Sequence, residues 1–299
     1  MAPKNLAEVP AEEVAAFVKS FDNILFDCDG VLLLGEDIIP GVKDSVNSMK
    51  EMGKEIKLIT NNSFRTTREW NEIFEDVELE FTSHDVIFPT KAVIHYLQAK
   101  KFNKKAFVLG QPAMVEELKE YGIGVYDYKD CPKLKHVSDL EDYIGDDLSI
   151  GAVIVDLDFN LTYPKLMKAA TILKRPDVHF IFCATDKTAP FGENYKIIGS
   201  YFIGETLEMI TGRKPVILGK PSVTYNNFVK KNYKKIDPAR TLFVGDSLMT
   251  DMLFATKCNY QKLLVLTGTT SYETMMSCSK EVSPKYYLRS LGDLHKLLN

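Results

Sequence analysis

The sequence lacks the patterns that place a protein in a membrane, on nucleic acid or around structural zinc. Its five cysteines include no Cys-x-x-Cys pair and its five histidines show no metal-ligand spacing, so we expect reduced thiols and no zinc site. No apolar run approaches the roughly 20 residues that span a bilayer, and no signal-peptide pattern opens the chain. A net charge of -4 gives no attraction to nucleic acid or anionic membrane. We expect a cytoplasmic protein with neither of these partners.

The composition is that of an ordinary globular protein. Apolar residues make up 45% and charged residues 26% of 299 residues, enough for one large or two modest domains. Apolar spacing predicts helices over residues 11–20, 42–52, 66–74, 89–99, 113–121, 163–173, 223–230, 248–257 and 291–298. Apolar runs predict strands over residues 24–26, 55–59, 106–110, 122–126, 152–155, 180–183, 216–218, 241–244 and 263–266. This alternation predicts an α/β fold with a doubly wound, Rossmann-like parallel sheet.

The alternation restarts once and then resumes. A basic stretch at residues 100–105 precedes a new set of apolar strands, and a Gly-Arg-Lys-Pro sequence at residues 212–215 marks the return of the first pattern. Residues 129–147 are polar and predict a surface loop. We therefore predict a core made of residues 1–102 and 214–299, interrupted by an inserted α/β domain of residues 103–213.

The first predicted core strand ends in two carboxylates and a glycine, Asp27, Asp29 and Gly30. In an extended chain Asp27 and Asp29 share a face and Cys28 points the other way, so Cys28 is expected in the core. Two neighbouring carboxylates repel each other unless a cation lies between them. A strand end that turns into solvent is the alternative, because Asp and Gly are common in turns.

Polar clusters follow four of the predicted strands. They are Asp27 with Asp29, Thr60 with Asn61, Lys220, and Asp246 with Asp251. Because ligands bind outside the carboxyl ends of parallel strands, we expect these clusters to share one crevice. Carboxylates suit a divalent cation, and lysine, hydroxyl and backbone N–H groups suit a phosphate beside it.

Each cluster taken alone also has a purely structural interpretation. Asp246 and Ser247 could cap a helix, and Thr60 with Asn61 could close a turn. A lysine before proline, as at Lys220, is most often a solvated surface residue. Their order along the chain, each after a strand, favours the shared site.

Four motifs in this order resemble those of haloacid dehalogenase-superfamily phosphatases. They read D-C-D-G-V-L at residues 27–32, T-N-N-S at 60–63, L-G-K-P at 218–221 and G-D-S-L-M-T-D at 245–251. Within that superfamily the chain resembles the branch containing 4-nitrophenylphosphatase, phosphoglycolate phosphatase and pyridoxal phosphate phosphatase. The resemblance runs from about residue 23 to the end and implies a core of that superfamily's type with a large α/β cap, here residues 103–213.

The resemblance also implies roles for the motif residues. Asp27 is the nucleophile that forms an aspartyl-phosphate, and Asp29 is the general acid and base. Magnesium is held by a carboxylate oxygen of Asp27, the main-chain carbonyl of Asp29, and Asp246, while Asp251 orients Lys220 or a metal-bound water. The residues implied in substrate binding are Gly30, Thr60, Asn61, Asn62 and Lys220.

The substrate is not settled by these motifs. The capped crevice favours small phosphorylated metabolites, with phosphoglycolate-like esters and 4-nitrophenyl phosphate as candidates. An A-T-D sequence ending at Asp186 resembles the pyridoxal phosphatase pattern, but Pro190 and Phe191 depart from it. Leu33 and Leu34 replace a more polar or aromatic pair, and Tyr201 and Asn259 stand where glycine is usual. Asn tolerates positive φ, so we expect the backbone at Asn259 to be preserved. Tyr201 could contact the substrate, but ordinary packing within the cap explains it at least as well.

Two other functions stay open at this point, and a third, that of a dehalogenase, is disfavoured. A phosphomutase uses the same nucleophile but excludes water, and a non-catalytic paralogue would only bind a phosphate ligand. That paralogue is disfavoured because a binding module has no need of both Asp27 and Asp29. A dehalogenase needs no magnesium site of the Asp246 type. A homodimer through the cap is also expected, because members of this family often dimerise there.

Overall fold

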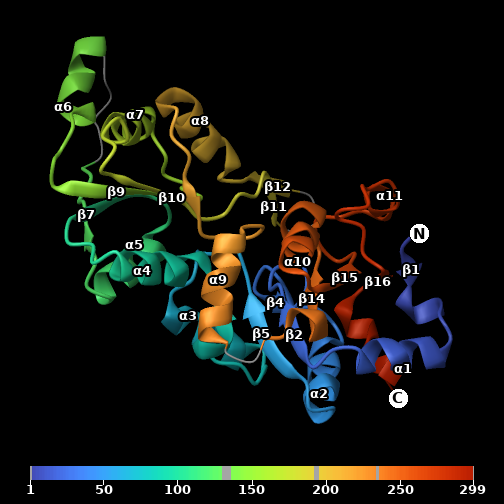
Figure 1. The fold of residues 1–299 in the computed structure, drawn as a ribbon. Coiled ribbons are helices and arrows are strands. Elements are labelled where there is room, and N and C mark those ends of the chain that lie inside the picture. The colour runs from blue at the N-terminus through green and yellow to red at the C-terminus, as the bar shows by residue number, and fades with distance from the viewer. Residues whose placement is uncertain (1, 130–135, 192–194, 234–235, 299) are drawn as a thin grey trace.

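The computed structural model describes residues 2–129, 136–191, 195–233 and 236–298 (Figure 1). Two parallel sheets organise this part of the chain. The larger has seven strands in the order β1-β16-β15-β14-β2-β5-β6. Their bounds are β1 Lys4–Asn5, β2 Asn23–Phe26, β5 Glu55–Ile59, β6 Val86–Ile87, β14 Thr241–Gly245, β15 Gln261–Val265 and β16 Tyr286–Leu288.

The smaller sheet has five parallel strands in the order β13-β10-β9-β7-β8. Their bounds are β7 Lys105–Leu109, β8 Gly124–Val125, β9 Ile150–Val155, β10 His179–Phe182 and β13 Val216–Ile217. Two antiparallel hairpins complete the strands: β3 Leu33–Leu34 with β4 Asp37–Ile38, and β11 Thr188–Phe191 with β12 Tyr195–Ile198. The α/β fold with parallel sheets is confirmed.

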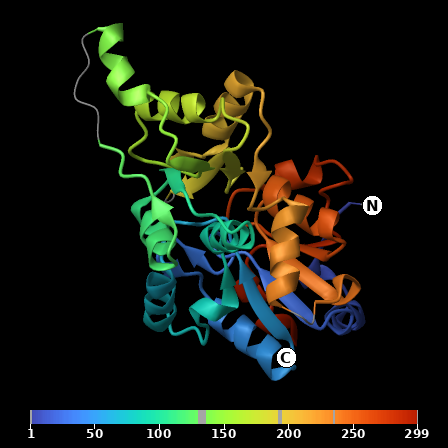
Figure 2. The ribbon, with the colours of Figure 1, turned by 60° about the vertical axis from the view of Figure 1, so that its left-hand side comes forward.

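Helices separate and cover the two sheets. Their bounds are α1 Ala11–Lys19, α2 Val42–Glu51, α3 Thr67–Asp76, α4 Pro89–Ala99, α5 Pro112–Glu120, α6 Glu141–Ile144, α7 Tyr163–Ile172, α8 Tyr201–Thr211, α9 Val223–Asn232, α10 Leu253–Cys258, α11 Tyr272–Met276 and α12 His295–Leu298. Helices α1, α2 and α3 pack on one face of the larger sheet, and α4, α9 and α10 pack on the other. Helices α7 and α8 cover the face of the smaller sheet that points away from the larger one (Figures 1 and 2).

Alternating side chains of the strands produce these layers. In β2, Ile24 and Phe26 enter the cluster under α1, α2 and α3, whereas Leu25 enters the cluster on the opposite face. That second cluster also contains Ala106 and Ile154 from the smaller sheet. One apolar core therefore joins the two sheets, because apolar faces of both are removed from water by the same helices.

The strand at residues 216–218 was predicted in the core sheet, and this is wrong. The structure pairs β13 with β10 at the edge of the smaller sheet, with Ile181 opposite Val216 and Phe182 opposite Ile217. Two residues carry too little periodicity to indicate a partner strand, so tertiary packing decides. The division into residues 1–102 with 214–299 and residues 103–213 remains a prediction.

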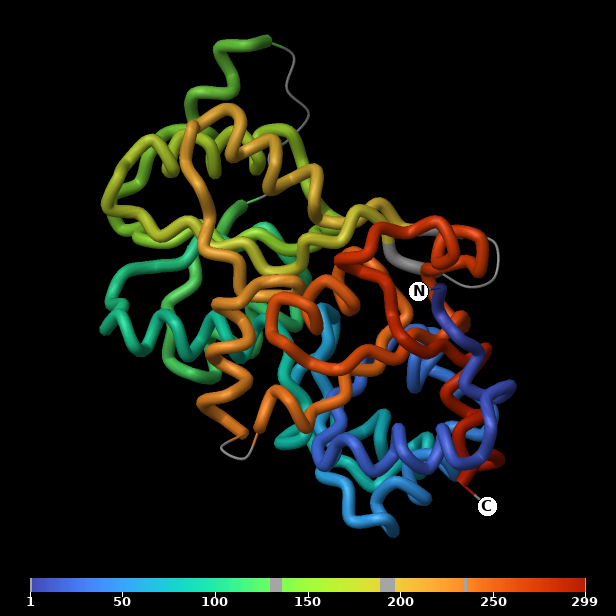
Figure 3. The backbone as a smooth tube through the Cα atoms, turned by 45° about the vertical axis from the view of Figure 1, so that its right-hand side comes forward, coloured from blue at the N-terminus to red at the C-terminus, as the bar shows by residue number. Residues whose placement is uncertain are grey.

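Several short elements were not predicted. Strand β1 pairs with β16, so the N-terminal segment runs beside the C-terminal part of the chain (Figure 3). The helix predicted over 248–257 begins instead as a π-helical segment, Leu248–Met252, followed by α10. Part of the predicted loop at 129–147 is helical at α6, and its residues 130–135 lie outside the described chain. Among the helices described, none has the length and apolar character that crossing a membrane requires.

Candidate active site

Two carboxylates follow neighbouring strands of the larger sheet. Asp27 comes directly after β2 and Asp246 directly after β14, and the two strands are parallel neighbours. The Asp27 N–H extends their ladder by donating to the Val244 carbonyl at 2.9 Å. Chain connections run outward in opposite directions from this pair, so the two side chains lie at the point where strand order reverses. Both are buried, as expected for a crevice between packed loops.

A third carboxylate, that of Asp251, lies beneath this edge. It is fully buried, and its Oδ2 accepts hydrogen bonds from the N–H groups of Asp246 and Ser247, each at 3.1 Å. A β-carbon at Gly245 would overlap the Asp251 side chain, so this position requires glycine. Asp251 therefore fixes the loop that carries Asp246.

Lys220 connects the carboxylates. Its ammonium lies 2.8 Å from Asp27 Oδ1 and 2.6 Å from Asp251 Oδ1, and only 1% of the residue is exposed. Burial by itself lowers the pKa of Lys220. The negative charges of Asp251 and Asp27 raise it by a larger amount, so the pKa lies above that of an ordinary lysine. Lys220 is therefore a buried cation, and its interpretation as a solvated surface lysine is wrong.

Negative charge exceeds positive charge at this point of the structure. Carboxylate oxygens of Asp27, Asp246 and Asp251 all lie within 4.8 Å of one another, and one ammonium faces them. Burial raises the pKa of Asp246 to about 7, and the charge of Asp251 adds to the shift. The pKa of Asp27 is raised for the same two reasons. A site with excess buried negative charge and oxygen donors fits a divalent cation such as Mg²⁺.

Asp29 and residues 60–62, which follow β5, form the part of the site next to these carboxylates. Asn62 Nδ2 donates to Asp29 Oδ2 at 3.0 Å, which holds the second carboxylate of the first motif. Thr60 is buried, and its hydroxyl accepts from the Asn62 N–H at 2.9 Å. The Tyr225 hydroxyl donates to the Thr60 carbonyl at 3.0 Å. The backbone of residues 60–62 is thus held by hydrogen bonds at Thr60 and at Asn62.

Asn61 joins three separate parts of the chain. Its Oδ1 accepts from the Lys220 N–H at 2.8 Å, and its Nδ2 donates to the Lys220 carbonyl at 3.1 Å and to Asp186 Oδ2 at 2.7 Å. Asp186 follows β10 of the smaller sheet. Burial raises the pKa of Asp186 to about 6. The Asn61 amide therefore ties both sheets together at the site.

Two glycines permit close packing around Asp246. Gly30 has φ +79°, and a β-carbon there would lie 3.0 Å from the Asp246 carboxylate. A β-carbon at Gly268 would overlap Asp246 Oδ2. That oxygen accepts from the Thr269 N–H at 2.5 Å. The Gly30 N–H donates to the Leu33 carbonyl at 2.7 Å and so closes its own loop.

Comparison with known proteins identifies the family to which this sequence and architecture belong. A haloacid dehalogenase-like hydrolase family model matches residues 24–124, and a second model of that kind matches residues 217–294. A 4-nitrophenylphosphatase of Schizosaccharomyces pombe is 34% identical over 95% of this chain and 96% of its own length. Phosphoglycolate phosphatase 2 of Arabidopsis thaliana is 31% identical over 100% and 99%. A glycerol phosphate phosphatase of Mycobacterium tuberculosis, solved in complex with magnesium, has TM-score 0.73 at 22% identity over 93% and 78%.

The chain belongs to the haloacid dehalogenase-like hydrolase family. The resemblance drawn from the four motifs is thereby confirmed. All four motifs of this hydrolase meet at one edge of the larger sheet, linked by the contacts of Lys220 and Asn61. The roles of the individual residues remain predictions.

Two contacts of this hydrolase were not foreseen. Asp186 was expected only in a substrate-selecting stretch, and its bond to Asn61 was not predicted. Its position four residues after the end of β10, beyond the carboxyl end of a strand of the smaller sheet, was a usable signal. The Thr269 N–H, which binds Asp246, belongs to a loop without a sequence signature, and backbone donors carry none.

The structure explains some of the departures from the family pattern. Asn259 has φ +59° and ends α10, as expected for asparagine in place of glycine. Tyr201 begins α8, and the Lys187 ammonium lies 5.1 Å from its ring centroid. Cys28 is buried in the core, as predicted. The side chains of Pro190 and Phe191 lie outside the described part of the structure.

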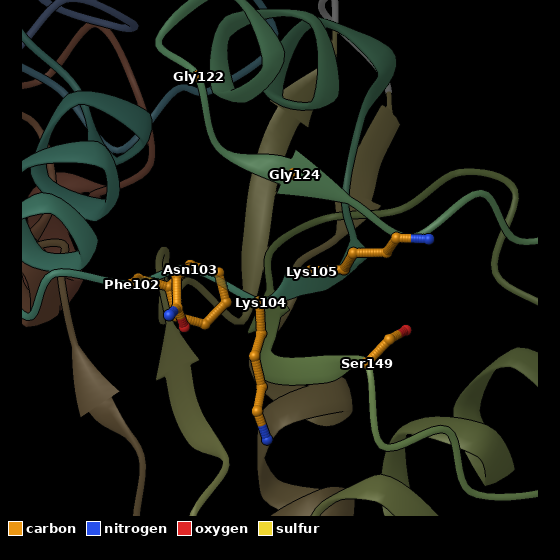
Figure 4. A pocket seen from close by; sticks show the side chains of 7 residues that line it. All are labelled: Phe102, Asn103, Lys104, Lys105, Gly122, Gly124 and Ser149. Carbon is orange, nitrogen blue, oxygen red and sulfur yellow. The ribbon is translucent and has the colours of Figure 1, made fainter.

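A separate hollow of about 340 Å³ opens at the other end of the smaller sheet. It is lined by Phe102, Asn103, Lys104, Lys105, Gly122, Gly124 and Ser149 (Figure 4). The Lys104 and Lys105 side chains point in different directions, and Lys104 pairs with Asp177 at 3.3 Å. Its charges do not converge on one point, so we assign it no ligand.

Proposed function

We propose that this chain, a phosphatase of the haloacid dehalogenase-like family, hydrolyses phosphate monoesters of small metabolites with Mg²⁺ through an aspartyl-phosphate. The observation that carries the proposal is the cluster of three buried carboxylates, two of them paired with one buried lysine, where the strand order reverses. A phosphate-binding protein without catalysis gains nothing from this concentration of negative charge, which repels its ligand.

The residues that would hold Mg²⁺ are Asp27, Asp246 and the main-chain carbonyl of Asp29. Asp251 is the less suitable ligand, because its two oxygens already bind Lys220 and two backbone N–H groups. When bound, the ion offsets the charge of the carboxylates and of the phosphoryl oxygens.

Asp27 has the position of a nucleophile. Its Oδ1 is held by the Lys220 ammonium and by the Cys28 N–H, each at 2.8 Å, so the carboxylate is oriented and Oδ2 is the oxygen that we assign to the attack. In the first step an Asp27 oxygen forms a bond to phosphorus while the ester P–O bond breaks. Lys220 favours the ionised carboxylate that this step requires.

Asp29 has the position of the acid and base. Its proton goes to the leaving oxygen in the first step, and in the second it takes a proton from the water that attacks the aspartyl-phosphate. Inorganic phosphate leaves and Asp27 is regenerated. Asn62 maintains the Asp29 carboxylate in place during both steps through its 3.0 Å hydrogen bond.

The remaining motif groups are proposed to bind the phosphoryl oxygens. Thr60, the backbone at Asn61 and Lys220 supply the donors in this scheme. Gly30 and Asn62, whose N–H groups already donate to the Leu33 carbonyl and the Thr60 hydroxyl, would shape the loops around the phosphate. The similarity to enzymes named for 4-nitrophenyl phosphate and phosphoglycolate supports small esters as substrates. Pyridoxal phosphate remains the other candidate of this class.

Phosphate release from a panel of esters, measured with Mg²⁺ and with EDTA, tests the proposal. The panel contains 4-nitrophenyl phosphate, phosphoglycolate, glycerol phosphate and pyridoxal phosphate. We expect turnover that EDTA abolishes, that Asp27→Asn abolishes, and that the matched surface change Asp37→Asn leaves unaltered. Conversion of a phosphate ester to an isomer without phosphate release indicates a phosphomutase. A phosphate-induced rise in Tm without any turnover indicates a binding protein and overturns the proposal.

A further inference from the structure

Two phenylalanines from distant parts of the sequence meet beside the proposed active site. Phe64 follows the second motif, and Phe159 lies in the loop between β9 and α7 of the smaller sheet. Their ring centroids are 5.4 Å apart and their planes are tilted by 43°. Phe159 nevertheless has 58% of its surface exposed. The contact therefore leaves most of one aromatic ring available to a further apolar group.

Phe64 is connected to Asp29 through one side chain. The Asn62 amide accepts from the Phe64 N–H at 2.9 Å and donates to the Asp29 carboxylate at 3.0 Å. The residue that protonates the leaving oxygen in our scheme and the residue that carries the aromatic ring are thus held by the same amide. Phe64 is therefore the first aromatic residue along this chain of hydrogen bonds from the carboxylate that protonates the leaving oxygen in our scheme.

The loop that carries Phe159 is rigidly held. Asp158 is buried, its Oδ1 accepts from the Asn160 N–H at 2.9 Å, and its Oδ2 pairs with Lys165 at 2.5 Å. An exposed aromatic ring between such anchors is presented at a fixed place, which lowers the entropic cost of binding a ligand against it.

Another apolar side chain lies on the same side of the site. Leu34 is 41% exposed in the β3–β4 hairpin. Arg65, the neighbour of Phe64, donates from Nη2 to the Gly35 carbonyl at 3.2 Å and so holds this hairpin against the segment after β5. The rim beyond Asp29 is therefore aromatic and aliphatic.

We propose that Phe64 and Phe159 form an apolar wall that binds the organic part of the substrate and favours phosphate esters with a flat aryl leaving group over esters of polyols. The inference rests on the proposed function and specifies its substrate class. An aryl ring packs against the exposed face of Phe159, whereas a hydroxylated chain gains little there and has to give up bound water.

Steady-state kinetics on 4-nitrophenyl phosphate and glycerol phosphate test this wall. We expect Phe159→Ala to lower kcat/KM for the aryl ester about three- to tenfold, mainly through KM, with less than about a twofold change for glycerol phosphate. Phe159→Leu retains an apolar side chain and should recover part of the loss. Each variant is compared with the wild-type protein on the same ester, so the intrinsic reactivity of the two leaving groups cancels.

Leu148→Ala is the matched control. Leu148 is 73% exposed and precedes β9, whereas Phe159 follows it, so the control removes an exposed apolar side chain from the opposite end of the same strand. We expect no kinetic change from it. Equal losses on both esters in Phe159→Ala, or no loss on either, would overturn the wall while leaving the proposed function intact. Absence of Mg²⁺-dependent turnover in the wild-type protein would overturn both.

Discussion

Replacing Asp156 by asparagine should stabilise the protein at neutral and alkaline pH. Asp156 follows β9 and is only 3% exposed. Its Oδ1 accepts from the Leu157 N–H at 2.7 Å. Its Oδ2 makes no hydrogen bond of ordinary geometry among the described residues, and the nearby Ser63 hydroxyl offsets only part of the rise in pKa. Burial raises the pKa of Asp156 to about 7, and the charge of Asp186 adds to the shift. An unpaired carboxylate at this position is costly once it ionises.

The expected gain in unfolding free energy follows from the pKa shift of Asp156. The pKa rises from an ordinary value of 3.8 to about 7, and each unit corresponds to about 1.4 kcal/mol, which gives about 4 kcal/mol in all. Because the pKa is higher in the folded chain, the protonated group stabilises the fold below the unfolded pKa. This contribution is lost as the pH rises through about 7. Asparagine never ionises, so the advantage of the variant grows with pH.

Urea unfolding of the two proteins side by side measures the difference. We expect Asp156→Asn to exceed the wild-type free energy of unfolding by about 4 kcal/mol at about pH 8 and by about 2 kcal/mol at about pH 5. All other titrating groups are common to both proteins and largely cancel. A difference that does not change with pH, or a variant less stable at the higher pH, would refute the reasoning.

Asp158, two residues further along, provides the control. Its carboxylate is also buried but pairs with Lys165 at 2.5 Å. Asp158→Asn breaks this pair and leaves the ammonium without its partner, so we expect a loss of about 3 kcal/mol. The same substitution should thus have opposite signs at the two positions.

Three further predictions concern the site and the assembly. Lys220→Met leaves buried carboxylates without their cation and should lower the unfolding free energy by about 3–5 kcal/mol in EDTA, with part of the loss restored by Mg²⁺; a loss below about 1 kcal/mol contradicts this. Gly268→Ala places a methyl group against the Asp246 carboxylate and should weaken Mg²⁺ binding in calorimetry at least about tenfold, and unchanged affinity would remove Asp246 from the ligand set. Light scattering tests the expected dimer through the cap. Met209 is exposed on α8, so if α8 forms the interface, Met209→Asp should convert the dimer to monomers.

Much of the local structure could be predicted from the sequence. The order of apolar runs and amphipathic helices indicated parallel α/β units. Ile24, Leu25 and Phe26 of β2 are all buried, on alternate faces of the sheet, as expected for a strand covered on both faces. The polar clusters after the strands indicated one site, because parallel strands end at a common edge. These features depend on residues close together in the sequence, where periodicity is informative.

Some strands of two or three residues escaped prediction because so short a segment carries no periodicity. Strands β1, β6 and β16 are too short to show a period, and they form because the neighbouring strands offer unpaired backbone groups. The π-helical segment Leu248–Met252 also interrupts a pattern that reads as an uninterrupted helix.

The sequence by itself determined the fold class, the family motifs and the set of residues gathered at the site. Only the tertiary structure placed β13 in the smaller sheet, buried Lys220 between Asp27 and Asp251, and joined Asn61 to Asp186. It also left one carboxylate oxygen of Asp156 without a hydrogen bond from the described residues and brought Phe64 against Phe159. Burial and pairing of this kind arise between segments on different sheets, and no local pattern records which distant group a side chain will meet.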